Sequence, residues 1–224
     1  MKQFSISKID YENARILLNQ ERIENLNISE MFKASIYCIL AQAERYDKQI
    51  KIYRRLLNAG IDSPETVFLK KDKLHQILKV SHYPNMKEKR IKDFSGWWVG
   101  AAIPHAILKD VDNGRNKGIK LRNDFAERAP SFGYKSASLL MIKCGYEDVI
   151  PIDIWILRFL KSMGYSVEAP DYLTVGGLTK KKYFKLEKIL RGLAEDKEVS
   201  LALFQGALWG KHSTWKVRKE RRLF

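Results

Sequence analysis

Helical periodicity is the feature of this sequence that most restricts its fold. Apolar residues recur at spacings of three and four along nearly the whole chain, and the alternation that marks a β-strand is almost absent. The sequence therefore predicts an all-α protein. An apolar fraction of 45% in 224 residues is enough for a packed core in one domain or in two small ones.

Several of the expected helices have recognisable start signals. Asn27 and Ser29 can cap one long helix whose apolar stripe continues to Leu57. Ser63 followed by Pro64 opens the next helix, because serine caps well and proline suits the first helical position. The other expected helices cover residues 11–24, 72–80, 86–94, 99–109, 120–127, 134–144, 155–163, 180–194 and 197–209, and residues 166–179 are expected to be irregular.

The charge balance predicts an anionic partner. Lysine and arginine total 41 against 26 acidic residues, which gives a formal net charge of +15. The basic residues are spread along the chain and interleaved with aromatic ones, so a folded nucleic-acid-binding protein is favoured over a basic tail.

Cysteine usage and hydropathy exclude other classes of protein. The two cysteines, Cys38 and Cys144, lie in apolar stretches, where thiols usually pack as small hydrophobes. They are too few for a zinc finger or an iron–sulfur cluster, and we expect no metal and no cofactor. No segment is apolar enough to span a membrane. We expect an intracellular protein of the cytoplasm or nucleoid that does not contact membranes.

A tight turn between two helices is the most informative segment. A short helix ends at Arg128, residues 129–133 form a hairpin, and the next helix begins at Tyr134. We expect Gly133 to adopt a positive φ, which would leave the amides of the following helix open to a phosphate. This is the helix-hairpin-helix pattern, which is compatible with DNA binding but also occurs as an ordinary helix–helix turn.

The residues after the hairpin resemble a known enzyme superfamily. From Lys135 to Asp153 the chain has one helix, a loop with Gly145 and Pro151, and an acid at the head of the next helix. This arrangement resembles the HhH-GPD base-excision DNA glycosylases. Within that superfamily it is most similar to the small prokaryotic 8-oxoguanine DNA glycosylase/AP lyases of the second type.

The resemblance implies both a fold and an activity. The fold would be a two-lobed, all-α HhH-GPD fold, with residues 27–146 in one lobe and residues 1–26 plus 147–224 in the other. The activity would be that of a bifunctional DNA glycosylase/AP lyase in base excision repair, which excises a damaged base and cleaves the strand by β-elimination through a lysine Schiff base. The best candidate for that base is 8-oxoguanine. The implied partner is double-stranded DNA with a damaged base or an abasic site, and we expect a monomer.

Lys135 is the candidate nucleophile. It lies in the first turn of a helix whose positions 139–142 are apolar, so we expect burial and the positive helix end to disfavour the ammonium form. A neutral amine can attack C1′ of a sugar and form a Schiff base. The alternative is a solvated lysine that only binds phosphate.

Asp153 is the second candidate catalytic residue. As an N-cap it would accept hydrogen bonds from the amides of Trp155 or Ile156 and stay ionised. An ionised carboxylate beside C1′ would stabilise the cationic sugar or help to deprotonate the lysine. Trp155 shares an apolar stripe with Phe159, and we expect it in the core.

Further site residues are implied by the resemblance. Gln42 matches a glutamine that fills the gap left by the extruded base, and Ser131 stands where the family often has glycine. The residues expected to contact DNA are Gln42, Ser131, Gly133 and Tyr134. Phe204 or Trp209 is expected to stack on the flipped base, while Lys211 or the tail after it closes the pocket. The alternative is that this last helix is simply core.

Two other functions stay open. One is a non-catalytic helix-hairpin-helix DNA-binding protein, in which Lys135 contacts a phosphate. The other is a glycosylase for another lesion, such as an oxidised pyrimidine, uracil or an alkylated purine.

Overall fold

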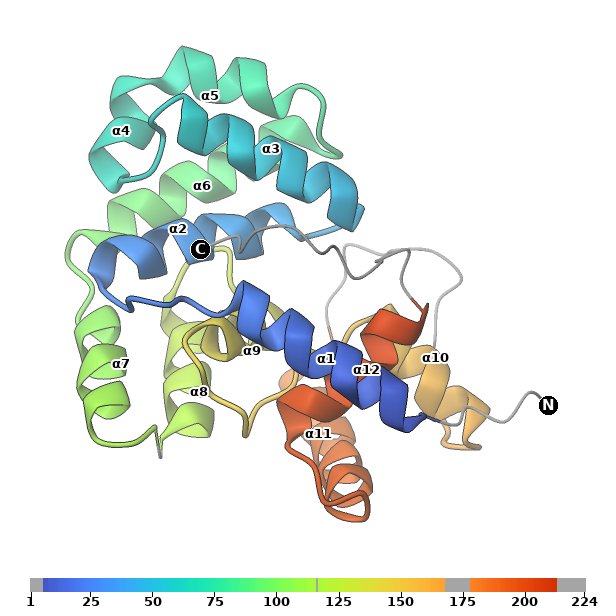
Figure 1. Cartoon of the computed structure of the whole chain (residues 1–224). Coiled ribbons are helices and arrows are strands. Elements are labelled where there is room, and N and C mark those ends of the chain that lie inside the picture. Colours follow the sequence, from blue (N-terminus) through green and yellow to red (C-terminus); the bar gives the residue numbers. More distant parts are fainter. Residues whose placement is uncertain (1–5, 116, 168–177, 213–224) are drawn as a thin grey trace.

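The computed structural model describes residues 6–115, 117–167 and 178–212, and all its regular structure in these ranges is helical (Figure 1). This confirms the all-α prediction. No helix in the described ranges is long and apolar enough to cross a membrane. The helices are α1 Lys8–Glu21, α2 Ile28–Leu40, α3 Tyr46–Asn58, α4 Pro64–Leu69, α5 Lys71–Leu78, α6 Pro84–Trp98, α7 Ile103–Asp112, α8 Gly118–Arg128, α9 Tyr134–Lys143, α10 Ile154–Ser162, α11 Lys180–Glu195 and α12 Leu201–His212.

Polar caps set several of the helix starts. Asn27 caps α2 and Ser63 caps α4, each by accepting a hydrogen bond from a backbone N–H of the first turn, as the sequence predicted. The first helix begins three residues earlier than expected, because Ser7 and Asp10 form a reciprocal capping box. Most of residues 166–179, expected to be irregular, lie outside the described ranges.

The single long helix expected over residues 29–57 is wrong. The segment forms two helices, α2 and α3, separated by a short turn in which Ala43 has a φ of 53°. Both helices face the same apolar core, so the apolar periodicity continues across the turn. The turn therefore cannot be recognised from the sequence pattern. Buried Glu44 holds the turn: its carboxylate accepts a hydrogen bond from the backbone N–H of His82 at 2.8 Å and pairs with Lys87 at 2.9 Å.

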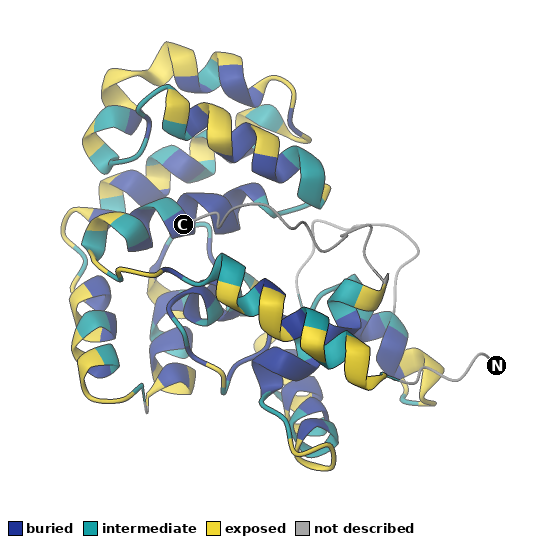
Figure 2. Ribbon diagram, in the orientation of Figure 1, coloured by how far each residue is buried: buried dark blue, intermediate teal, exposed yellow. Residues whose placement is uncertain are grey.

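The buried apolar residues form two main clusters. The larger lies between Ile23 and Val149 and also buries both cysteines, and the second lies between Ile150 and Leu208. In Figure 2, α2 is largely dark blue between the helices that cover it, whereas α3 to α5 expose their outer faces. The chain passes from one cluster to the other in the loop between α9 and α10, and α1 packs along α12. The residue bounds of the two lobes remain a prediction.

A buried ion pair connects three helices. The guanidinium of Arg122 on α8 donates to the carboxylate of Glu187 on α11 at 2.9 and 2.8 Å, and to the hydroxyl of Ser138 on α9 at 3.0 Å. The arginine side chain has no exposed surface. The rings of Tyr134 and Tyr183 lie with their centroids 5.7 and 5.4 Å from the guanidinium carbon. Helices α8, α9 and α11 are therefore held around one charged group.

Removing one partner of this pair should destabilise the fold strongly. Glu187→Ala leaves the Arg122 guanidinium buried without its carboxylate, which should lower the free energy of unfolding by about 3–5 kcal/mol. The matched control is Asp93→Ala, because Asp93 pairs with Lys89 at the surface, where their side chains are 43% and 75% exposed. That change should cost less than about 1 kcal/mol. Urea unfolding measures both, and equal losses would contradict a structural role for the buried pair.

Candidate active site

The hairpin between α8 and α9 turns at a different residue from the one expected. Ser131 has a φ of 70°, whereas Gly133 is extended, with φ −119° and ψ −177°. The prediction of a positive φ at the glycine is therefore wrong. Ser131 is held in this conformation from two sides, since its hydroxyl donates to the carbonyl of Arg90 at 3.3 Å and its own carbonyl accepts from Gln42 at 2.9 Å.

Gly133 instead leaves room at the start of α9. It is the N-cap of that helix and provides no side-chain cap, and a Cβ added there would meet no atom within 4 Å. The first amides of an α-helix have no acceptor within the helix and carry its positive dipole end. The start of α9 is thus an open position at which an anion can approach these amides.

Lys135 is exposed in the structure, as the second residue of α9, and it lines a cavity. This differs from the expected burial. Of the apolar residues further along the helix, Leu140 and Met141 are fully buried, while the first turn of α9 reaches the surface. The fold therefore does not desolvate this amine by itself.

Asp153 lines the same cavity from the loop before α10. Its carboxylate accepts hydrogen bonds from the backbone N–H groups of Trp155 at 2.9 Å and Ile156 at 3.0 Å, which confirms the predicted cap. Burial raises the pKa of Asp153, and it outweighs the positive charge of Lys135 and these two amides, which act to lower the pKa. Desolvation of the carboxylate therefore has a larger effect on its pKa than the cap and the neighbouring lysine together.

Tyr183 fixes the two candidate catalytic segments relative to each other. Its hydroxyl lies 3.0 Å from the hydroxyl of Ser138 and 3.3 Å from the carbonyl of Tyr134, next to Lys135. The same hydroxyl donates to the carbonyl of Ile150, in the loop before Asp153. Burial raises the pKa of Tyr183 to about 12, so the hydroxyl remains a donor at neutral pH.

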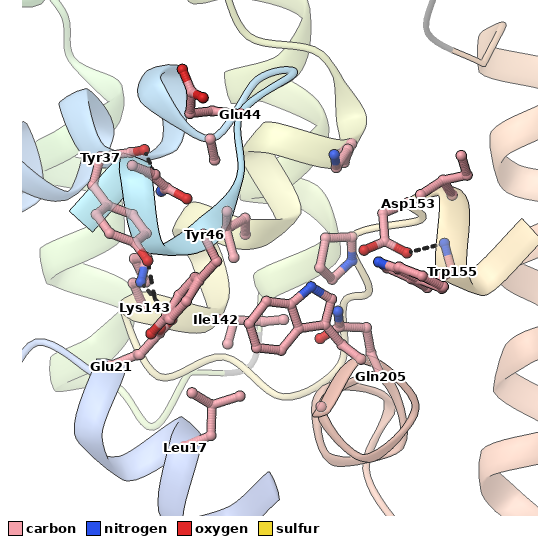
Figure 3. A pocket seen from close by; sticks show the side chains of 18 of the residues that line it. Leu17, Glu21, Tyr37, Glu44, Tyr46, Ile142, Lys143, Asp153, Trp155 and Gln205 are labelled. Atoms are coloured by element: carbon pink, nitrogen blue, oxygen red, sulfur yellow. Dashed lines mark hydrogen bonds and ion pairs between the residues drawn. The ribbon is translucent and has the colours of Figure 1, made fainter. Parts of the chain in front are cut away.

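The cavity has a volume of about 410 Å³, within the size range of small-molecule sites. Residues of α1, α2, the α2–α3 turn, α3, α9, the α9–α10 loop, α10 and α12 line it. Figure 3 shows Asp153 and Trp155 on one side of the space and Glu21 and Lys143 on the other. Apolar side chains cover much of the wall, among them Leu17, Leu18, Leu139, Ile142 and Pro151.

The three residues of α12 that were expected to form the base pocket do not all face the cavity. Trp209 lines the cavity, and its ring meets that of Tyr46 edge-on, with 5.1 Å between centroids. Phe204 is only 2% exposed and packs against Phe159 in the second apolar cluster, so it does not face the cavity. Lys211 is exposed, lies 3.5 Å from Asp10 and does not line the cavity. The tail expected to close the pocket lies outside the described residues from residue 213 onward.

The structure places Gln42 against the hairpin and not in the cavity. Its amide nitrogen donates to the carbonyl of Ser131 and lies 3.4 Å from the hydroxyl of Ser136, while its amide oxygen accepts from Arg90. Tyr134 is partly buried, and its hydroxyl donates to Glu127 at 2.9 Å. Gln42 and the hairpin residues are thus brought together beside the cavity.

Trp155 and a polar cluster were not expected at this site. Trp155 lines the cavity instead of packing in the core, with the guanidinium carbon of Arg158 4.9 Å from its ring centroid. Glu21, Tyr46 and Lys143 also line the cavity. No local pattern marks these three residues, because they come from three helices that meet only in the folded chain.

Comparison with solved structures identifies the fold. A solved structure of 8-oxoguanine DNA glycosylase from Methanocaldococcus jannaschii superposes with a TM-score of 0.72 at 22% identity, covering 95% of this chain and 91% of that one. The Thermotoga maritima 8-oxoguanine DNA glycosylase gives a TM-score of 0.65 at 21% identity, covering 95% of this chain and 90% of that one. The fold is therefore that of the helix-hairpin-helix DNA glycosylases.

Sequence comparison gives the family. The family model described as 8-oxoguanine DNA glycosylase matches residues 13–199. The chain therefore belongs to the 8-oxoguanine DNA glycosylase family. The 8-oxoguanine DNA glycosylase/AP lyase of M. jannaschii is 27% identical over 83% of this chain and 82% of its own length. The enzyme of the same description from Sulfolobus acidocaldarius is 23% identical over 90% of this chain and 89% of its own length.

The raised pKa of Asp153 predicts how its replacement affects stability. A carboxyl whose pKa is raised by folding is easier to bury when protonated, so it destabilises the fold as the pH rises through that pKa. Asp153→Asn keeps an N-cap acceptor and cannot ionise. We therefore expect it to raise the Tm at pH 7, by a margin that shrinks below pH 4. Calorimetry across this range measures the margin.

The control for this prediction is Asp153→Ala. It removes the hydrogen bonds to both amides as well as the charge. Loss of the cap should lower the free energy of unfolding by about 1 kcal/mol relative to Asp153→Asn, and the Tm should fall with it. A Tm for Asp153→Asn below that of the unmodified protein at pH 7 would show that the ionised carboxylate stabilises the fold.

Proposed function

We propose that this protein is a bifunctional DNA glycosylase/AP lyase that excises 8-oxoguanine from double-stranded DNA and then cleaves the strand at the abasic site. The observation that carries the proposal is that Lys135 and Asp153 line one cavity next to the hairpin, in a chain of the 8-oxoguanine DNA glycosylase family. A related M. jannaschii glycosylase/lyase has been solved with a 15mer DNA containing 8-oxoguanine, and it superposes with a TM-score of 0.69 at 23% identity, covering 97% of this chain and 95% of that one.

The reaction uses the Lys135 amine as the nucleophile. The amine bonds to C1′ while the glycosidic bond breaks, so the electron pair leaves with the base, which takes up a proton. The amine then loses a proton and the C1′–O4′ bond breaks, so that O4′ takes up a proton and an imine forms at C1′. The imine acidifies the proton at C2′, and removal of that proton expels the 3′ phosphate by β-elimination. Hydrolysis of the imine then frees the lysine.

Asp153 has two functions in this scheme. Its carboxylate lies in the same cavity as Lys135 and stabilises the positive charge that develops on the sugar as the base departs. Its raised pKa also makes it a better proton acceptor than an ordinary aspartate, which suits it to take a proton from the lysine.

DNA binding uses the hairpin and the positive charge of the protein. The open amides at the start of α9 bind a backbone phosphate, with Ser131 and Tyr134 beside them. Gln42, next to the hairpin, fills the gap left by the flipped base. The two predicted lobes, residues 27–146 and residues 1–26 plus 147–224, flank the base cavity. The protein acts as a monomer on DNA in the nucleoid.

Borohydride trapping tests the nucleophile. Reduction of the imine should link the unmodified protein covalently to a duplex with an abasic site or 8-oxoguanine, and Lys135→Gln should bind the duplex without crosslinking. Lys73→Gln, at an exposed position on α5, is the matched control and should crosslink normally. Crosslinking by Lys135→Gln at the normal rate would show that another residue is the nucleophile. Binding without crosslinking by the unmodified protein would favour the non-catalytic alternative.

Replacing Trp209 separates base recognition from strand cleavage. Trp209→Ala removes the large aromatic wall of the cavity, so excision of 8-oxoguanine opposite cytosine should fall by an order of magnitude or more, since stacking on an aromatic side chain is worth about 1–3 kcal/mol per base. Cleavage of a preformed abasic site should persist, because no base is present there. Phe204→Leu, in the core, is the control. It should lower stability but leave the ratio of 8-oxoguanine excision to abasic-site cleavage unchanged. Parallel loss of both activities would assign Trp209 to the fold.

The same assay tests the lesion. Gel analysis should show 8-oxoguanine strands cut in preference to strands carrying uracil, thymine glycol or hypoxanthine. If the protein cleaves only the strand with the abasic site, the proposed lyase activity is supported and 8-oxoguanine is rejected as the substrate.

A further inference from the structure

A cluster of hydrogen-bonded polar side chains lies in the cavity wall away from Asp153 (Figure 3). The Glu21 carboxylate accepts from the hydroxyl of Tyr46 at 2.7 Å and from that of Tyr37 at 3.5 Å, and it pairs with the Lys143 ammonium at 3.0 Å. The side chain of Lys143 is only 1% exposed, whereas that of Glu21 is 16% exposed. The carboxylate is thus the more accessible member of the ion pair.

The cluster fixes the position of the carboxylate. The Lys143 ammonium lies 4.1 Å from the centroid of the Tyr37 ring, and the backbone N–H of Ile23, just after α1, donates to the carbonyl of Lys143 at 2.9 Å. The end of α1 is therefore tied to the end of α9. Glu21 is held in a defined place by groups on α2, α3 and α9.

The distance from Lys135 fits a nucleoside. Lys135 and Lys143 both belong to α9, eight residues apart, which corresponds to about 12 Å along the helix axis. The cavity wall between them is apolar, formed by Leu139 and Ile142. A purine whose C1′ lies at Lys135 would stack across this wall and direct its far edge toward Glu21.

We infer that Glu21 recognises the guanine-type edge of the flipped base, by accepting hydrogen bonds from the adjacent N1–H and exocyclic N2–H groups. This inference rests on the proposed function. A carboxylate has about four acceptor sites, and the longest of its three present hydrogen bonds, from Tyr37, is the one a base can replace most easily. Two neighbouring donors on the base match two carboxylate oxygens, as in other bidentate contacts.

The geometry predicts which bases are rejected. Adenine-type bases present a lone pair at N1, which would face the carboxylate and leave both groups without a partner. A pyrimidine is shorter and would not reach Glu21 from Lys135. Guanine and 8-oxoguanine share the N1–H and N2–H groups, so Glu21 selects the type of base and another group must detect the oxidation.

The test compares three oxidised purines in single-turnover excision. The duplexes carry 8-oxoguanine, 8-oxohypoxanthine, which lacks the exocyclic amine, or 8-oxoadenine. The unmodified protein should excise 8-oxoguanine fastest and 8-oxoadenine slowest. Glu21→Gln should slow 8-oxoguanine excision on the order of tenfold to a hundredfold, because its amide group meets the base amine as donor against donor. The rate ratio of 8-oxoguanine to 8-oxohypoxanthine should then fall toward one.

Two further variants distinguish a loss of base recognition from a loss of folding. Glu30→Gln, the same change at a glutamate of α2 that pairs with Lys33 and does not line the cavity, is the matched control and should change neither ratio nor rate. Glu21→Met combined with Lys143→Met removes the carboxylate without leaving a buried charge unpaired, a type of change that is often neutral for stability. This double variant should also lose the preference for 8-oxoguanine. The Tm and the cleavage of an abasic duplex are measured for each variant.

Three results would overturn the inference, and they are distinguishable. Glu21→Gln or the double variant could excise 8-oxoguanine normally, with an unchanged rate ratio of 8-oxoguanine to 8-oxohypoxanthine. This result would show that Glu21 does not recognise the base, and it would leave the proposed function intact. Equal loss of excision and abasic-site cleavage would assign the cluster to the fold. Failure of the unmodified protein to excise 8-oxoguanine while it cleaves abasic DNA would reject the proposed substrate and the inference with it.

Discussion

The hydroxyl of Tyr183 is the contact on which the geometry of the site depends. From α11 it reaches the carbonyls of Ile150 and Tyr134, so a single group spans the segments that carry the candidate aspartate and lysine. The buried ion pair of Arg122 and Glu187 lies beside it and fixes α11 against α8 and α9. Because Tyr183, Arg122 and Glu187 are buried, a shift of the tyrosine would leave polar atoms without partners, which is costly. The network therefore makes the relative position of the two segments a property of the fold.

The hairpin and the α2–α3 turn constrain each other in a similar way. Ser131 and Ala43 both have a positive φ, a conformation that costs non-glycine residues of order 1–3 kcal/mol and that persists only where the surroundings enforce it. Gln42, next to Ala43, donates to the Ser131 carbonyl and so joins the two turns. For Gln42 to enter a gap in the duplex, this hydrogen bond has to break. Base and phosphate groups of bound DNA would then replace the protein groups as its partners.

The sequence predicted what depends on local pattern and missed what depends on tertiary contact. The all-α class, the caps at Asn27 and Ser63 and the N-cap role of Asp153 follow from short-range chemistry. The turn at Ala43 has no glycine or proline to signal it, and the apolar stripe runs through it. Glu21 gave no signal either, because an acid at the end of an amphipathic helix is ordinary until three other helices supply its partners.

Lys135 is exposed in the free protein, so the fold alone does not desolvate the amine that we propose as the nucleophile. Burial already raises the pKa of Asp153, while the charge of Lys135 acts to lower it. When a duplex covers the mouth of the cavity and excludes water, both charges become more expensive to maintain. In the reaction proposed above, transfer of one proton from the ammonium to the carboxylate would remove both charges together and leave a neutral amine beside C1′. In the proposed reaction, the nucleophile would thus form only where a substrate seals the site.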